Sequence, residues 1–138
     1  MNIIHQVEKT IGFNQCDPAG IMYFAESFTL AHQLIEGFIA ASDIGWSSWF
    51  AHPVMVFPLV HASCDYWLPL AAGTRCILTL GIGRLSASSI TFITRAYAED
   101  KDAACLRVKT VHVAVNKSKQ QKSGFPSDMY KTLGVYHT

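Results

Sequence analysis

Length, composition and charge exclude several classes of protein. The chain has 138 residues, of which 50% are hydrophobic and 15% are charged, and its net charge is +1. This length fits one domain, 1–138, around one core. The near-zero charge gives no electrostatic reason to expect nucleic acid as a partner. No apolar run approaches the ~20 residues of a membrane span, and the N-terminus lacks a signal-peptide pattern, so we expect a cytoplasmic protein without a membrane partner.

The predicted elements begin with a strand, a loop and a long helix. Residues 3–14 mix apolar and polar positions as a strand does, and a loop with Pro18 and Gly20 follows. Over 23–41 apolar residues recur at helical spacing, for about five turns. This helix is too apolar to lie on an open surface, so we expect other elements to cover it nearly all round.

Strand patterns dominate the rest of the chain. One helical turn near 47–50 comes first, and a short helix near 127–133 ends the chain. Between them short turns separate most of the strands, which predicts an antiparallel meander. We interpret the glycines in 81–87 as a bulge inside a strand. The predicted strands are 59–69, 73–85, 88–100 and 103–116.

One long apolar helix and one twisted sheet have a simple common solution, in which the sheet wraps around the helix. The fold class is therefore α+β, with a five-stranded antiparallel sheet around one central helix, the arrangement called the hotdog fold. Such a sheet keeps an exposed edge, which pairing across a twofold axis would cover. Together with the high apolar content, this predicts a homodimer or a tetramer made of two dimers.

The cysteines and histidines give no sign of a metal site. The four cysteines are scattered without a CxxC pair, so neither a zinc site nor a disulfide framework is expected. Cys64, Cys76 and Cys105 are interpreted as small buried hydrophobes. The histidines show no ligand spacing, and the spacing of His32 and Glu36 suits a surface pair on one helix face.

Among the ionisable residues, Asp17 has the most informative position. The sequence Asp-Pro-Ala-Gly reads locally as a turn. It also lies directly before the N-terminus of the long helix, where unpaired N–H groups and a partial positive charge gather. An oxyanion near the amides of Met22, Tyr23 or Phe24 would be stabilised, with the carboxylate on the other side of the reacting carbon. These are the two parts that acyl transfer needs, and both interpretations stay open.

Two segments resemble a known family. FNQCDPAGIMYFAESF (13–28) closely resembles the signature of the 4-hydroxybenzoyl-CoA thioesterase branch of hotdog acyl-CoA thioesterases, and FPLVHASCDYWLPLAAGTR (57–75) resembles 1,4-dihydroxy-2-naphthoyl-CoA thioesterases. The resemblance implies hydrolysis of 1,4-dihydroxy-2-naphthoyl-CoA to 1,4-dihydroxy-2-naphthoate and CoA in phylloquinone (vitamin K1) biosynthesis. It implies no cofactor, since CoA is part of the substrate, and no metal.

The resemblance also implies roles for individual residues. Asp17 would be the nucleophile or the general base, Gly20 would let the loop approach the thioester, and the backbone N–H of Phe24 would polarise the carbonyl. A thiolate is a good leaving group, so no strong general acid is required. For Trp46 and Phe57, packing in the core is an equal alternative. The residues expected near the substrate are Tyr23, Trp46, Phe57, His61 and Ser63.

Two alternatives remain beside this interpretation. One is a thioesterase of the same fold for another aryl-CoA, acyl-CoA or acyl-carrier-protein substrate. The other is a module that binds an acyl thioester without cleaving it. Candidate cations for the CoA phosphates are Arg84, Arg95, Lys117, Lys119 and Lys122.

Overall fold

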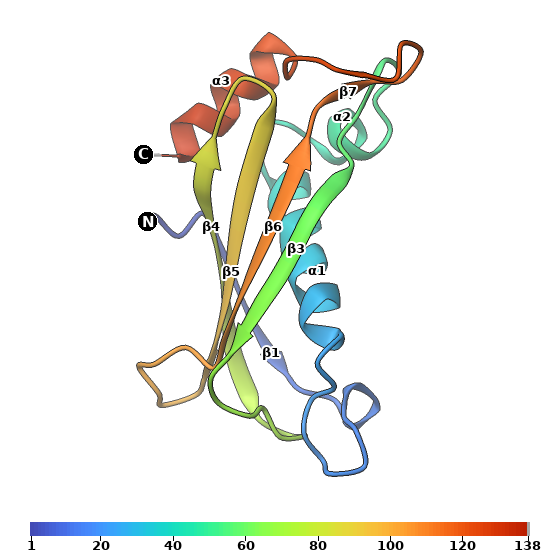
Figure 1. The fold of residues 1–138 in the computed structure, drawn as a ribbon. Coiled ribbons are helices and arrows are strands. Elements are labelled where there is room, and N and C mark those ends of the chain that lie inside the picture. The colour runs from blue at the N-terminus through green and yellow to red at the C-terminus, as the bar shows by residue number, and fades with distance from the viewer. Residues whose placement is uncertain (138) are drawn as a thin grey trace.

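The computed structural model describes residues 1–137 and shows one long helix against one face of a twisted sheet (Figure 1). Within this range five strands form an antiparallel sheet in the order β1-β4-β5-β6-β3. The predicted α+β arrangement is therefore confirmed. The strands are β1 (His5–Thr10), β3 (Leu59–Tyr66), β4 (Arg75–Leu85), β5 (Ser89–Ala98) and β6 (Leu106–Val113).

The strand order corrects the prediction of one continuous meander. β4, β5 and β6 form a meander, but β3 pairs with β6 and β1 pairs with β4. The connection 67–74 carries the chain from β3 across β6 and β5 to β4. Three strand spacings are about 14 Å, and eight extended residues span up to about 27 Å, so this connection is long enough. As a result β1 and β3 are the two edges of the sheet.

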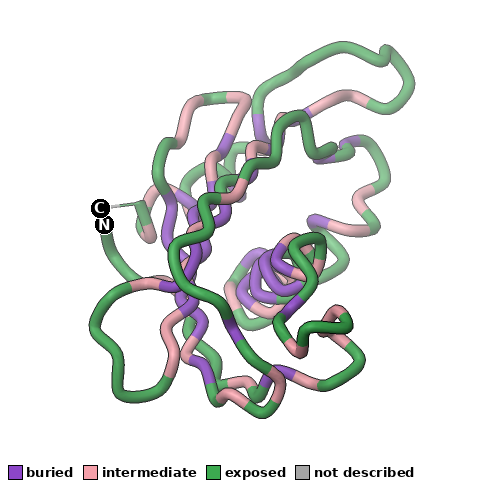
Figure 2. Tube along the Cα trace, turned by 60° about the horizontal axis from the view of Figure 1, so that its bottom comes forward, coloured by how far each residue is buried: buried purple, intermediate pink, exposed green. Residues whose placement is uncertain are grey.

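The long helix α1 (Glu26–Ala41) begins three residues later than predicted. Tyr23 accepts the Glu26 N–H at 2.9 Å in a tight turn that precedes the regular helix. The expectation of cover nearly all round is wrong for one chain, because Gln33 and Ala40 are exposed. Figure 2 shows the buried residues concentrated on α1 and the central strands. The buried stripe of α1 is Ser27, Leu30, Ala31, Leu34, Ile35, Phe38 and Ile39.

The shorter elements agree with the sequence in outline. The predicted first strand ends early because Phe13–Gln15 forms a 3-10 helix, η1. The helices α2 (Trp46–Phe50) and α3 (Ser127–Tyr136) cover the two helical predictions. The register of β4 shifts between Ile82 and Arg84, which confirms the bulge. In residues 1–137 three further strands form a small second sheet, made of β2 (Met55–Val56), β7 (Val115–Asn116) and β8 (Gln121–Lys122).

The interior contains an aromatic stack at the α2 end of the molecule. Trp49 and Phe57 stack with ring centroids 4.5 Å apart, and Phe125 lies 5.8 Å from Phe57. The four cysteines are free thiols; Cys76 and Cys105 are buried, as predicted. Cys64 is only half-buried, because it lies on the edge strand β3. No helix within residues 1–137 is long and apolar enough to cross a membrane.

Candidate active site

The loop with Asp17 is a short hairpin that leads into α1. At its tip the Gly20 N–H donates to the Asp17 carbonyl oxygen at 2.9 Å, which confirms the predicted turn. Gly20 has a φ of +77°, a conformation that favours glycine, and a Cβ there would meet nothing within 4 Å. The arms are joined by bonds from the Asp17 N–H to Ile21 (2.9 Å) and from the Tyr23 N–H to Gln15 (2.8 Å).

The connection after β3 fastens this hairpin to the sheet. The Met22 N–H donates to the Leu70 carbonyl oxygen at 2.7 Å, and the Ala72 N–H donates to the Gly20 carbonyl oxygen at 3.0 Å. Besides joining β3 to β4, the connection 67–74 therefore fixes the arm of the hairpin that enters α1.

The two oxygens of the Asp17 carboxylate differ in their surroundings. Oδ1 accepts the Ala19 N–H at 2.9 Å and lies 3.4 Å from the Ile21 nitrogen. Oδ2 has no hydrogen-bond partner among residues 1–137, and the side chain is half-buried. One oxygen thus holds the turn and the other is free for chemistry, so the turn interpretation and the catalytic interpretation are compatible.

Only one of the three amides suggested by the sequence has a free N–H. Met22 and Tyr23 both donate to carbonyl oxygens within the hairpin and its fastening segment. The Phe24 N–H has no acceptor in the part of the chain that the structure describes. It lies at the start of α1, where the helix dipole adds partial positive charge. Of the three amides, Phe24 is therefore the one whose N–H is free to meet an oxyanion.

Two hydroxyls hold the carbonyl oxygen of Phe24 in place. The Phe24 carbonyl oxygen lies 2.7 Å from Ser27 Oγ and 2.5 Å from the Tyr66 hydroxyl, and these hydroxyls lie 2.8 Å apart. Only two hydroxyl protons, those of Ser27 and Tyr66, are shared among these three contacts. If one hydroxyl donates to the other, the second still donates to the carbonyl oxygen, so at least one hydroxyl always does. Partial burial raises the pKa of the Tyr66 phenol further above neutrality, so the hydroxyl keeps its proton. Tyr66 thereby ties the end of β3 to the first turn of α1.

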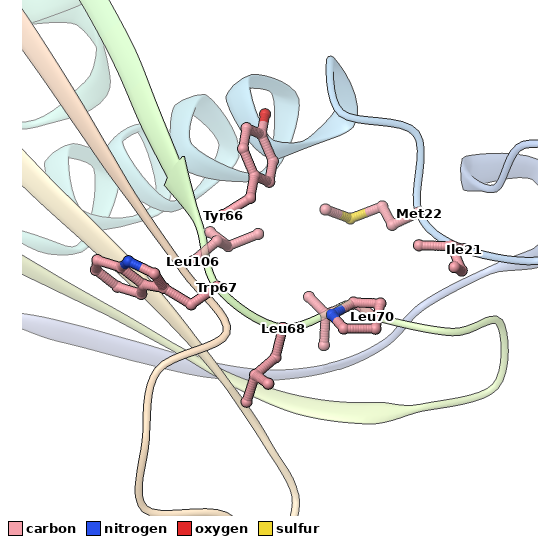
Figure 3. A pocket seen from close by; sticks show the side chains of 8 residues that line it. Ile21, Met22, Tyr66, Trp67, Leu68, Leu70 and Leu106 are labelled. Atoms are coloured by element: carbon pink, nitrogen blue, oxygen red, sulfur yellow. The ribbon is translucent and has the colours of Figure 1, made fainter.

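An apolar hollow of about 270 Å³ lies between the hairpin and the end of β3 (Figure 3). The Tyr66 ring rises from the strand toward α1, and Met22 enters from the hairpin side. Tyr66 thus links this hollow to the Phe24 carbonyl oxygen, which its hydroxyl contacts. Its lining residues are Ile21, Met22, Tyr66, Trp67, Leu68, Pro69, Leu70 and Leu106.

Comparison with known proteins identifies the family. Residues 11–133 match the model of the thioesterase-like superfamily. The chain belongs to the thioesterase-like superfamily. A 1,4-dihydroxy-2-naphthoyl-CoA hydrolase from Rippkaea orientalis is 32% identical over 127 residues, covering 91% of each chain. Another from Nostoc punctiforme is 26% identical over 125 residues, covering 91% of this chain and 83% of that one.

Two solved structures share the fold. A 1,4-dihydroxy-2-naphthoyl-CoA thioesterase from Synechocystis superposes with a TM-score of 0.85 at 22% identity, covering 94% of this chain and 95% of that one. A Staphylococcus aureus protein in complex with CoA superposes with a TM-score of 0.88 at 12% identity, covering 99% and 84%. The hotdog thioesterase family inferred from the two sequence segments is confirmed.

Not every residue expected near the thioesterase substrate lies near Asp17. Tyr23 does, since it is exposed beside Phe24 with ring centroids 4.8 Å apart. His61 and Ser63 bond to each other at 3.3 Å on β3. Ala62, Cys64 and Tyr66 alternate toward α1, so His61 and Ser63 lie on the opposite face of the sheet. Within one chain the structure does not bring them to the hairpin.

Trp46 and Phe57 lie toward the other end of α1. Trp46 donates from Nε1 to Glu36 at 3.1 Å, so Glu36 has Trp46 as its partner and no bond to His32 is seen among the described residues. Phe57 belongs to the buried aromatic stack, which favours the core-packing alternative for it. Glu36, which Trp46 contacts, lies 12 residues after Phe24, about 18 Å further along at 1.5 Å per residue.

Three basic residues gather on the face of the sheet that points away from α1. A hollow of about 550 Å³ there is lined by Arg84, Arg107 and Lys109, among others. Arg107 also bonds Asp65 at 3.0 Å. Of the predicted cations only Arg84 lines this hollow, and Lys117 borders a different one at the α2 end. Arg107 and Lys109 were not among the predicted cations. The alternation of apolar and basic residues in β6, which is visible in the sequence, places both on this face.

Proposed function

We propose that this member of the thioesterase-like superfamily hydrolyses 1,4-dihydroxy-2-naphthoyl-CoA to 1,4-dihydroxy-2-naphthoate and CoA. The observation that carries the proposal is a hairpin leading into α1 on which, among residues 1–137, Asp17 has one carboxylate oxygen without a partner and Phe24 has a backbone N–H without an acceptor. The chain also resembles curated hydrolases of this thioester over most of its length. A place in phylloquinone biosynthesis and a cytoplasmic location stay predictions.

The proposed reaction uses the two groups from opposite sides of the thioester carbonyl. Its oxygen accepts the Phe24 N–H and gains negative charge as the carbon is attacked, and this donor at a helix start stabilises that charge. Asp17 either attacks the carbon directly, forming a mixed anhydride that water then cleaves, or removes a proton from the attacking water. In both routes the C–S bond breaks and CoA leaves as the thiolate, which takes up a proton from water.

Two substitutions at Phe24 test the oxyanion donor. Proline is tolerated in a first helical turn but has no N–H, so Phe24→Pro should lower kcat by about 10²–10³-fold, the usual cost of losing one oxyanion donor. Phe24→Ala keeps the N–H and should stay within a few-fold of the wild type. Equal kcat values for the two variants, both folded by circular dichroism, would contradict the assignment.

A panel of thioesters tests the substrate. Release of free thiol is followed with dihydroxynaphthoyl, benzoyl and straight-chain CoA esters and with an acyl-carrier-protein ester. The proposal expects the highest kcat/KM for the dihydroxynaphthoyl ester. Preference for another ester would support a different thioesterase substrate, and binding without release of thiol from any ester would support a non-catalytic module.

We further propose that the chain forms a homodimer through β3. This edge strand and the residues after it expose Leu59, Val60, Tyr66, Trp67 and Leu68, each by 46–57%. A long apolar edge is a hazard unless another chain covers it. The other edge, β1, carries charged residues, and its Glu8 pairs with Arg75. If β3 pairs along its whole length with its copy, Leu59 of one chain lies opposite Tyr66 of the other.

A matched pair of edge substitutions tests the dimer. Val60→Lys places charge on β3, and Val7→Lys places the same charge on β1. Sedimentation velocity should show a monomer for Val60→Lys and a dimer for Val7→Lys. A dimer that persists in Val60→Lys and is lost in Val7→Lys would assign the interface to β1 instead.

A further inference from the structure

A second, smaller hollow lies between α1 and the strands β3 and β6. Its volume is about 130 Å³, and an apolar cavity of about 150 Å³ holds one benzene molecule. It shares His32, Leu59 and His112 with a larger hollow of about 390 Å³, which leaves room for a second ring or a substituent. The small hollow is lined by Phe28, His32, Ile35, Leu59, Ala62, Thr110 and His112.

The protonation of His112 follows from its partner. The side chain is only 6% exposed, and its Nδ1 lies 2.9 Å from the Phe57 carbonyl oxygen. A carbonyl oxygen can only accept, so Nδ1 carries the proton. Burial lowers the pKa of His112 and outweighs the hydrogen bond to Phe57, which raises it, so the ring is neutral at pH 7. Its Nε2 therefore presents a lone pair.

This lone pair has no partner within residues 1–137. In the described part of the chain every fully buried side-chain nitrogen and oxygen has a hydrogen-bond partner. Nε2 of His112 has none there, so it must reach accessible space, and His112 borders both hollows. An apolar site for one aromatic ring thus contains a buried hydrogen-bond acceptor.

We propose that this hollow binds a hydroxylated aromatic ring and that Nε2 of His112 accepts the hydrogen bond of a ring hydroxyl. An acceptor without a proton selects a donor, so the site discriminates a hydroxyl from an ether or a bare C–H. The inference rests on the proposed function, because it assigns the recognition of the acyl group that the reaction releases.

The hollow and the Asp17 hairpin of one chain lie too far apart along β3 to bind the same acyl group. His112 pairs with Leu59, and Tyr66, which touches the peptide of Phe24, lies seven residues further along the strand. Seven residues span about 23 Å, which is longer than a two-ring acyl group. Full pairing of β3 with its copy places Leu59 of a second chain opposite Tyr66. The hollow of one chain then recognises the acyl group held at the Asp17 hairpin of the other.

The first test uses ligands on the unmodified protein. Isothermal titration compares 1,4-dihydroxy-2-naphthoate, its 1,4-dimethyl ether and 2-naphthoate. The dihydroxy acid should bind at least about tenfold more tightly than both others, the value of one well-formed hydrogen bond. The ¹⁵N resonance of His112 Nε2 should shift with the dihydroxy acid only. Equal affinities, or tighter binding without that shift, would overturn the inference.

The second test uses variants. His112→Phe removes the acceptor and should abolish the preference for hydroxyls, whereas His137→Phe, on an exposed histidine at the end of α3, should keep it. A preference retained in folded His112→Phe would overturn the inference. If His112→Phe does not fold, the ligand series and the Nε2 shift decide alone.

The third test asks whether the site is shared between chains. Asp17→Asn and His112→Phe proteins are unfolded together and refolded as a mixture. If each site takes Asp17 from one chain and His112 from the other, every mixed dimer keeps one intact site. Mixed dimers make up half of the population and have one working site of two, so the mixture should reach about a quarter of wild-type activity. Activity no higher than the mean of the parents would contradict sharing. Absence of hydrolysis in the wild type itself, with hydroxyl-dependent binding intact, would reject the proposed reaction and leave the recognition by His112.

Discussion

The two ends of α1 differ in what their aromatic residues do. At the Asp17 end Tyr23 and Phe24 are about half exposed. The groups there that are free to take part in a reaction are the Phe24 N–H and one carboxylate oxygen of Asp17. At the α2 end Trp49, Phe57 and Phe125 form a buried stack, with His112 against its edge. The comparison indicates that one end supplies reactivity with little packing and the other supplies packing and recognition.

Matched truncations should separate the two ends most strongly in stability. Phe57→Ala removes a ring from the buried stack and should lower the free energy of unfolding by about 3–5 kcal/mol. Phe24→Ala removes a ring that is 59% exposed and should cost less than about 1 kcal/mol. Urea denaturation followed by circular dichroism measures both. Similar losses at the two positions would break the comparison.

The hydroxyl of Tyr66 should affect catalysis more than folding. Tyr66→Phe removes one of the two hydroxyls that hold the Phe24 carbonyl oxygen and thereby fix the backbone on either side of the Phe24 Cα, so kcat should fall about tenfold while KM changes little. Tyr130→Phe, on exposed α3, is the control and should leave both constants unchanged. A rise in KM at constant kcat would instead place Tyr66 in substrate binding alone.

Acid should destabilise the protein through His112. Its pKa is lowered in the folded state, so below the unfolded value of about 6.5 the unfolded chain binds a proton that the folded chain does not. The contribution of His112 to stability should be constant above that pH and should fall by about 1.4 kcal/mol per pH unit between that pH and the folded pKa. Urea midpoints from pH 7.5 to 5 measure this, and His112→Phe should show a smaller loss. Stability that rises on acidification would contradict the neutral ring.

The sequence predicted local features well because they depend on neighbouring residues. Periodicity located α1, the strands and both short helices, and Asp-Pro-Ala-Gly predicted the turn at Asp17. The pairing of β3 with β6 could not be derived, because it depends on where a long connection crosses the sheet.

The missed site residues share one cause. Ser27 meets Tyr66 across 39 positions, and His112 meets Phe57 across 55. No local pattern marks such contacts. The choice of Phe24 among three amides likewise required the bonds that Met22 and Tyr23 make elsewhere.

The most direct measurement of the central claim is the kcat of Asp17→Asn on 1,4-dihydroxy-2-naphthoyl-CoA, beside Asp43→Asn as a control at the far end of α1. Asparagine can accept the same backbone N–H bonds, so the turn and the fold should remain. We expect Asp17→Asn to lose about 10²–10⁴-fold in kcat, the contribution of a positioned base, and Asp43→Asn to match the wild type. A folded Asp17→Asn protein with wild-type turnover would contradict the account.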